Sequence, residues 1–256
     1  MRIALFTWSA ARVGGTETYL DHIISELPEL GHELAFLCES DGGVERDRIR
    51  IPSEVPIWKV SELGVQGALE AVRRWAPDLI YSHGGVDHRD LEAMLPEIAP
   101  SLFFAHNYYG TCISGSKTFR SPVARPCSRV FGPACLAYYF PRRCGGRSPM
   151  TMWQSYRTQV ERLDALRRYD AIVVVSAHMR DEYIAHGFDP ERVRLIPYVA
   201  ASPGAADMDG GVADRSMPPP HTGAPIRLLF VGRMDTLKGG DVLLAALPTV
   251  ASAVSR

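Results

Sequence analysis

Residues 2–27 read RIALFTWSAARVGGTETYLDHIISEL and carry the strongest indication of the fold. The run Arg2–Thr7 is apolar without alternation, which is typical of a strand buried on both faces of a sheet. Gly14 and Gly15 follow it, and the apolar residues at positions 20, 23, 24 and 27 then share one face of a helix. A strand, a glycine turn and an amphipathic helix, in that order, predict a βα unit.

The same alternation continues along the chain. Ser148 and Ser176 stand where helix N-caps are expected, and Gly187 stands where a helix can end with positive φ. Further strands are predicted at 33–38, 55–60, 78–81, 101–106, 170–175 and 193–196, and a further helix at 63–75. Strands that alternate with helices predict an α/β class with a mainly parallel sheet and helices on both faces.

The carboxyl ends of the predicted strands carry the first candidate site residues. Ligands of open parallel sheets bind beyond these ends. Gly14, Gly15, His83, His106 and Ser176 each follow a predicted strand. A glycine pair before a helix also lets a phosphate approach the free N–H groups of that helix, although a plain tight turn gives the same pattern.

Composition divides the chain into three parts. Residues 1–200 form the first predicted domain, which contains an irregular Cys- and Arg-rich insert at about 107–147. Residues 201–225 are rich in Gly, Ala, Pro and Asp and predict a linker. Residues 226–256 predict a strand to Val231, a loop and a helix from Gly239, the beginning of a second domain.

The overall composition excludes several classes of protein. The 256 residues include 28 Lys and Arg against 29 Asp and Glu, with 46% apolar and 22% charged residues, as in ordinary globular proteins. No uncharged apolar run is long enough for a transmembrane helix. Ile3–Ala11 fits a first strand better than a targeting peptide, so a cytoplasmic location is the default expectation.

A second candidate phosphate site lies in the stretch FVGRMDTLKGG, residues 230–240. Its predicted strand delivers Arg233 into a loop, and Lys238 precedes the glycine pair that opens a helix. A guanidinium, an ammonium and a helix N-terminus around one pocket suit a diphosphate.

Together these segments resemble the glycosyltransferases of family 4, which have the GT-B fold of two Rossmann-like domains. The resemblance rests on GGTETYL at 14–20, on VVS at 174–176 with RVRLIP at 192–197, and on FVGR at 230–233 with Lys238–Gly239. It implies transfer of a sugar from a nucleotide sugar to an acceptor with retention at the anomeric carbon, in cell-surface polysaccharide or glycoconjugate synthesis.

The resemblance also implies roles for single residues. Arg233 and Lys238 correspond to residues that bind the donor diphosphate, and Gly14 with Gly15 lines the phosphate side of the cleft. His106 matches a histidine that faces the reacting sugar. Separately from the resemblance, its position after a predicted strand makes His83 a candidate contact to the sugar or acceptor, and a structural histidine beside a glycine turn fits it equally well. Such a site usually needs no metal or other cofactor for catalysis.

Two departures from the family pattern limit this expectation. The family's Glu-x7-Glu donor motif is not among the 256 residues, and Ile196–Val199 reads IPYV where IPNG is common. The chain therefore looks truncated, and we expect little transfer from these residues alone. One alternative is a non-catalytic module that binds a nucleotide sugar or a glycan or has a regulatory role. Another is a different α/β nucleotide-binding enzyme, such as an epimerase with the GT-B fold.

Four cysteines mark the insert. Cys112, Cys127, Cys135 and Cys144 lie within 33 residues of one another and contain no Cys-x-x-Cys spacing. Free thiols, a structural metal site and two disulfides all fit this clustering. Cys38 falls in a predicted strand and is expected in the core.

Residues 98–160 hold eight Lys and Arg and no Asp or Glu, with aromatic residues between them. Such a surface suits an anionic or lipid-linked acceptor, or a peripheral contact at the inner membrane face, whereas a solvated loop packed by its own aromatics is the simpler reading. No nucleic-acid-binding motif accompanies the charge, so a nucleic-acid partner is not expected.

Overall fold

The computed structural model describes residues 1–12, 14–40, 48–198, 228–232 and 238–254. The backbone packs into two units, Met1–Tyr198 and Val199–Arg256. The predicted linker at 201–225 lies outside the described residues.

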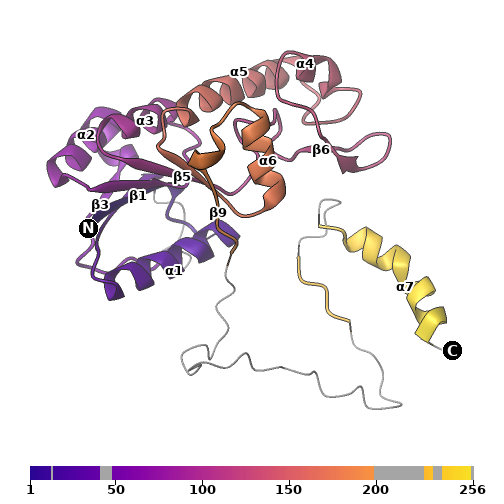
Figure 1. Ribbon diagram of the computed structural model, residues 1–256, viewed down its shortest axis with the longest axis horizontal. Coiled ribbons are helices and arrows are strands. Elements are labelled where there is room, and N and C mark those ends of the chain that lie inside the picture. Colours follow the sequence, from indigo (N-terminus) through magenta and orange to yellow (C-terminus); the bar gives the residue numbers. More distant parts are fainter. Residues whose placement is uncertain (13, 41–47, 199–227, 233–237, 255–256) are drawn as a thin grey trace. The chain divides into compact units, whose positions relative to one another are not determined.

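The first unit alternates strands and helices along most of its length (Figure 1). In chain order its elements are β1 (Arg2–Ser9), α1 (Gly15–Glu29), β2 (Glu33–Ser40), β3 (Ile57–Lys59), α2 (Val60–Trp75), β4 (Leu79–Ser82), α3 (Arg89–Met94), the 3-10 helix η2 (Leu95–Glu97), β5 (Ser101–Ala105), β6 (Thr118–Phe119), β7 (Arg125–Pro126), α4 (Ala134–Tyr139), α5 (Pro149–Leu166), β8 (Ala171–Val174), α6 (Ala177–Ala185), the 3-10 helix η3 (Pro190–Arg192) and β9 (Val193–Leu195).

Seven strands form one parallel sheet in the order β3-β2-β1-β4-β5-β8-β9. The chain runs from β1 outward to β3, returns to β4 on the other side of β1 and continues to the far edge. The direction of travel therefore reverses between β1 and β4, the point where open α/β sheets bind their ligands. The predicted α/β class with a Rossmann-like sheet is confirmed.

Both faces of the sheet are apolar because alternate side chains of each strand point to opposite faces. Ile3 and Leu5 of β1 pack with Leu20 of α1, whereas Phe6 packs on the other face with Leu69 of α2. Figure 1 shows α1 on one side of the sheet and α2, α3 and α5 on the other. This two-sided burial explains why the strands read as continuous apolar runs.

The predicted helix ends are present. The Ser148 hydroxyl accepts the Thr151 N–H at the start of α5, and the Ser176 hydroxyl accepts the Met179 N–H at the start of α6. Gly187 follows α6 with a φ of +84°, a conformation that favours glycine.

The insert at 107–147 is more regular than predicted. It contains the hairpin β6–β7 and helix α4, and its own small core includes Ile113, Phe119, Phe131 and Tyr139. Elements of two to six residues are too short to show a hydrophobic period, which is why the sequence pattern missed them. α3 was missed for the same reason.

A buried ion pair fastens the insert to the rest of the unit. Lys117 Nζ lies 2.5 Å from Glu182 of α6, and the two side chains are only 2% and 9% exposed. The insert is therefore a packed part of the first unit.

The helical spacing of Trp153, Val160 and Leu163 predicts one buried apolar stripe on α5, and this prediction is wrong for Trp153, which is 50% exposed. Val160 and Leu163 pack against the insert core as predicted. Trp153 lies near the exposed N-terminal end of the helix.

The second unit is described only in part. Helix α7 (Gly240–Val254) confirms the predicted helix. The predicted strand at 226–231 is not seen in its described part, because Leu228–Val231 pairs with no other described strand. Leu229 and Val231 are more than 80% exposed, as expected for a strand sequence without a sheet neighbour.

In the part of the chain that the structure describes, no helix combines the length and apolarity needed to cross a bilayer.

Candidate functional site

Two histidines meet at the carboxyl ends of neighbouring strands. His83 follows β4 and His106 follows β5, and β4 pairs directly with β5. His83 Nδ1 and His106 Nε2 are 2.9 Å apart, a hydrogen-bond distance. The structure thus brings together the two histidines that the strand-end argument selected separately.

Burial keeps both imidazoles neutral. It lowers the pKa of His106 to about 4. It lowers the pKa of His83 well below its usual value, and the neighbouring His106 adds to this effect. A pair of neutral imidazoles can relay a hydrogen bond near pH 7 but carries no positive charge there.

Tyr198 completes this chain of polar groups. Its hydroxyl lies 2.6 Å from His106 Nδ1, and burial raises the pKa of Tyr198 to about 12, so the phenol keeps its proton. A neutral imidazole has one N–H. If Tyr198 donates to Nδ1, then His106 donates through Nε2 to His83, and His83 carries its own proton on Nε2. That Nε2 atom is buried and has no partner among the described residues.

The buried histidines predict acid sensitivity. The folded-state pKa of His106, about 4, lies below the unfolded value of about 6.5. The contribution of each buried histidine to the free energy of unfolding is therefore complete above pH 6.5. It falls as the pH drops from 6.5 towards 4, by at most about 1.4 kcal/mol per pH unit for each histidine. Urea unfolding between pH 7.5 and 5 measures this slope.

Two variants test the origin of this slope, one at His106 and one, as the control, at His22. His106→Gln should make the slope shallower, with the His83 contribution remaining, whereas His22→Gln should leave it unchanged, because His22 is 48% exposed on α1. An equal slope in all three proteins would contradict the prediction.

A cavity of about 320 Å³ opens beside the two histidines. Its lining includes Trp8 at the end of β1, Thr16 in the first turn of α1, and both histidines. The ends of β1, β4 and β5 and the N-terminus of α1 therefore converge on one space, where the sheet's strand order reverses.

The Gly14–Gly15 turn begins α1 at this cavity. Gly14 donates its N–H to Glu17 Oε2 at 2.7 Å, and Glu17 is buried. A Cβ atom on Gly15 would meet no other atom within 4 Å, so the fold itself does not require glycine there. Thr16, the next residue, lines the cavity. A helix N-terminus in this position attracts anions.

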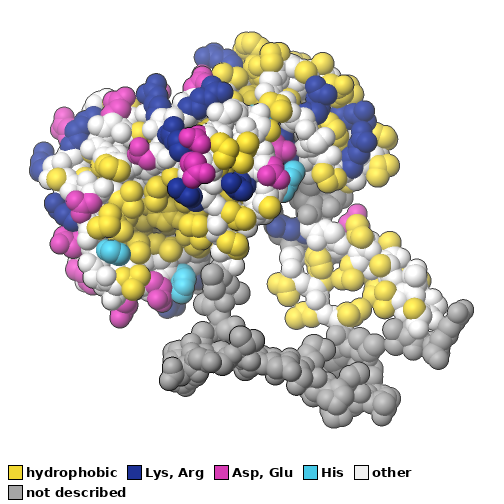
Figure 2. All heavy atoms as spheres, in the orientation of Figure 1, with side chains coloured by type: hydrophobic (Ala, Val, Ile, Leu, Met, Phe, Trp, Pro, Cys, Tyr) yellow, Lys and Arg dark blue, Asp and Glu magenta, His cyan; other side chains and the backbone are white. Residues whose placement is uncertain are grey.

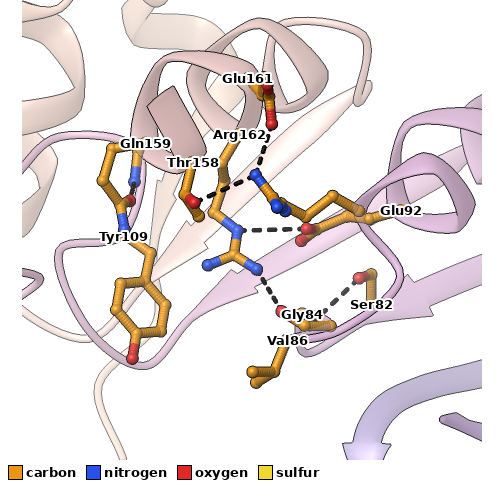
Figure 3. Close-up of polar contacts among 12 residues, drawn as sticks. Ser82, Gly84, Val86, Glu92, Tyr109, Thr158, Gln159, Glu161 and Arg162 are labelled. Carbon is orange, nitrogen blue, oxygen red and sulfur yellow. Dashed lines mark hydrogen bonds and ion pairs between the residues drawn. The ribbon is translucent and has the colours of Figure 1, made fainter. Parts of the chain in front are cut away.

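Arg162 is a site residue that the sequence did not reveal. It extends from α5 to the cavity, where its Nε donates to Glu92 Oε2 of α3 at 3.2 Å and its Nη2 donates to the Gly85 carbonyl (Figure 3). The side chains of Arg162 and Glu92 are 4% and 1% exposed. In the sequence Arg162 looks like the exposed charged residues of the same helix, and only its tertiary contacts distinguish it from them.

One nitrogen of Arg162 remains available. Nη1 has no hydrogen-bond partner among the described residues and points to the side on which Tyr109 lies (Figure 3). The Tyr109 ring centre is 4.9 Å from the guanidinium carbon. Burial raises the pKa of Glu92, while Arg162 opposes that rise. The cavity floor therefore presents a buried cation with an unused donor.

Glu39, a second missed residue, holds the loop after His83. Its carboxylate accepts the N–H groups of Val86, Asp87 and His88 at 2.8 to 3.0 Å. A Cβ atom on Gly85 would lie 2.5 Å from Glu39 Oε1, so only glycine fits at that position. The loop that links His83 to α3 is thus fixed by a buried carboxylate at the end of β2.

The predicted donor residues, Arg233 and Lys238, belong to the second unit. Arg233 lies outside the described residues. Lys238 is exposed just before α7. Their role in binding a diphosphate stays a prediction.

The four insert cysteines are free thiols, and Cys127, Cys135 and Cys144 belong to or pack against the insert core. Burial and the thiols of Cys112, Cys127 and Cys135 raise the pKa of Cys144 to about 11. Among the described residues, no three His, Cys, Asp or Glu side chains are arranged to hold a metal ion. The structural metal site stays a prediction, and metal analysis of protein purified without chelator tests it.

Comparison with known proteins identifies the first unit. A sequence model of glycosyltransferase family 4 matches residues 13–198. The chain belongs to glycosyltransferase family 4. The match includes the Gly14–Gly15 turn, both histidines, Arg162 and Tyr198, so the whole candidate site lies in the family 4 region. No match is found among curated protein sequences.

Several solved structures are similar to this family 4 chain. The lipopolysaccharide outer core galactosyltransferase WaaB is 11% identical, with 78% of this chain and 46% of that chain covered and a TM-score of 0.45. Sucrose-phosphate synthase from Thermosynechococcus elongatus is 13% identical, with coverage of 78% and 48% and a TM-score of 0.47. The chain spans about half the length of these structures.

Proposed function

We propose that this chain is the acceptor-side part of a glycosyltransferase that moves a sugar from a nucleotide sugar to an acceptor with retention at the anomeric carbon. The family 4 match over residues 13–198 carries the proposal. It is supported by the cavity that His83 and His106 share with the N-terminus of α1. Synthesis of a cell-surface polysaccharide or glycoconjugate is the setting that the resemblance favours.

Sugar transfer from a nucleotide sugar requires stabilisation of a leaving diphosphate, which these residues can provide. The bond between the anomeric carbon and the diphosphate oxygen breaks, a bond from that carbon to the acceptor oxygen forms, and the proton of the acceptor hydroxyl passes to the leaving diphosphate. Negative charge grows on the leaving diphosphate, and fixed dipoles and cations stabilise it without reorganising. The N-terminus of α1 is one such group, and Arg233 and Lys238 are the others. Because these groups supply the positive charge, transfer should persist in EDTA.

His106 acts through hydrogen bonds in this proposal. A pKa of about 4 leaves it neutral near pH 7, so it orients a sugar hydroxyl and does not serve as an acid. Both of its nitrogens already have partners, so a sugar hydroxyl must replace the Tyr198 hydroxyl at Nδ1. Arg162 Nη1 supplies a hydrogen-bond donor for an acceptor substrate that carries an anionic group.

Gly15→Ala provides a test with little risk of misfolding. The added methyl meets no atom within 4 Å in the fold, and alanine favours a helix more than glycine does. If a donor phosphate approaches this turn, the methyl should weaken nucleotide-sugar binding about tenfold. Calorimetric titration of the parent protein and of the variant with a panel of nucleotide sugars measures the effect.

Gly132→Ala is the matched control, because its Cβ also meets nothing within 4 Å and it lies in the insert. Equal affinities for both variants and the parent protein would contradict a phosphate site at Gly15. Binding without transfer to any acceptor would favour the non-catalytic module instead.

A further inference from the structure

The insert surface differs from the rest of the first unit in charge. We define it as residues 107–147 together with the first turn of α5, residues 149–153. The wider segment 98–160 contains eight Lys and Arg and no Asp or Glu. Lys117 is buried against Glu182, and Arg157 pairs with Glu161 of its own helix.

Six arginines of this segment have no carboxylate partner within the described part of the chain. They are Arg120, Arg125, Arg129, Arg142, Arg143 and Arg147. Three of them lie over aromatic rings: Arg125 and Arg142 over Phe119, and Arg129 over Tyr138, at 4.3 to 5.6 Å. The rings hold these guanidinium groups in place without neutralising their charge.

Large apolar side chains are also exposed in this segment. Val123 in the β6–β7 turn is 71% exposed, and Met150 and Trp153 at the start of α5 are 64% and 50% exposed. Val130 and Phe140 add to them. In Figure 2 the part of the molecule that carries α4 and β6 shows hydrophobic and basic side chains side by side and no acidic ones in that view.

We propose that the insert surface docks on a bilayer that contains anionic lipid. Arginine suits the phosphate level of such a bilayer, and its long stem reaches there from an apolar surface. Tryptophan and aliphatic side chains suit the layer just below. A soluble phosphorylated ligand would need the arginines but would leave the exposed apolar residues without a purpose.

The arginines and the exposed apolar residues together set two requirements for the lipid to which this surface binds. Charge alone predicts binding that high salt abolishes, and apolar residues alone predict binding to neutral lipid as well. Their combination predicts binding that requires anionic lipid and is weakened by removing either kind. The proposal is independent of the proposed transfer reaction, because vesicle binding needs neither donor nor acceptor.

Co-sedimentation with vesicles tests the proposal. The full chain should bind vesicles of phosphatidylcholine with 30% phosphatidylglycerol at 0.1 M salt, and should not bind phosphatidylcholine alone. Replacement of Arg120, Arg143 and Arg147 by Gln should lower the partition coefficient by roughly 100-fold, at about fivefold for each arginine. Trp153→Gln should lower it about tenfold.

The matched control removes three arginines elsewhere. Arg73, Arg74 and Arg194 are exposed on α2 and β9, so their replacement by Gln changes the net charge equally but leaves the insert surface intact. This control should bind within threefold of the parent. The fluorescence of Trp153 is the part of the emission that the Trp153→Phe variant lacks. Brominated lipid should quench this part, and such quenching would place Trp153 in the bilayer.

Three results would overturn the proposal. One is failure to bind anionic vesicles even at 0.05 M salt. Another is an equal loss in the insert variant and the control variant, which would mean that only net charge matters. The third is binding of single-stranded RNA without binding of vesicles, which would assign the surface to nucleic acid.

Discussion

Replacement of His106 by alanine is expected to lower the turnover of sugar transfer by about 100-fold. The imidazole is neutral and buried, and its bond to His83 fixes it, so once a sugar hydroxyl has replaced Tyr198 at Nδ1 that hydrogen bond needs no further reorganisation when charge separates. Loss of one such preorganised group typically lowers kcat by 100- to 1000-fold. Release of nucleoside diphosphate by the full-length protein measures the rate.

His22→Ala is the control, because His22 lies exposed on α1 and away from the cavity. It should keep the parent rate. The unfolding midpoint of both variants must be measured, so that a folding defect is not mistaken for a catalytic one. A His106→Ala rate within threefold of the parent, in a folded protein, would exclude His106 from the reaction.

Replacement of Arg162 by methionine is expected to lower the free energy of unfolding by about 3 to 5 kcal/mol at pH 8. The change leaves the Glu92 carboxylate buried without its cation, and an unpaired buried charge is costly. It also removes the donor to the Gly85 carbonyl, which holds the loop after His83. Urea unfolding gives the value.

The pH dependence identifies the cause. Without Arg162, burial holds the pKa of Glu92 above its unfolded value, so the deficit is largest at high pH and shrinks as Glu92 takes up a proton. Arg157→Met is the matched control on the same helix, because Arg157 also pairs with a glutamate but is 64% exposed. It should cost less than about 1 kcal/mol at every pH.

The double replacement Glu92→Leu with Arg162→Met separates charge from shape. A buried ion pair can be exchanged for apolar residues at little cost. The double variant should therefore be more stable than Arg162→Met alone. If it is equally unstable, lost packing and the lost bond to Gly85 explain the deficit better than the unpaired carboxylate does.

Most of the sheet could be read from local pattern. Buried parallel strands are short apolar runs, and the helices that follow them carry one apolar face. Residues 2–27 therefore predict the ends of β1 and α1 to within two residues of the observed ends. Ser148 and Ser176 also signal their helices locally, because a cap bonds to a backbone N–H three residues away.

The histidine pair was half predictable. Position after a strand selected His83 and His106 separately, because parallel strands end at one edge of the sheet. Their mutual hydrogen bond depends on β4 lying beside β5, and the link to Tyr198 joins residues 92 positions apart. Sequence spacing contains no information about such a pairing.

Local periodicity and strand-end position determine the class of fold, the helix caps and the edge of the sheet where ligands bind, since each depends on neighbours a few residues apart. Tertiary packing alone decides that Arg162 is buried while Arg157 of the same helix is exposed, and that Glu39 holds the loop after His83. A charged side chain becomes part of a site when distant elements exclude water around it, and that exclusion exists only in the folded chain.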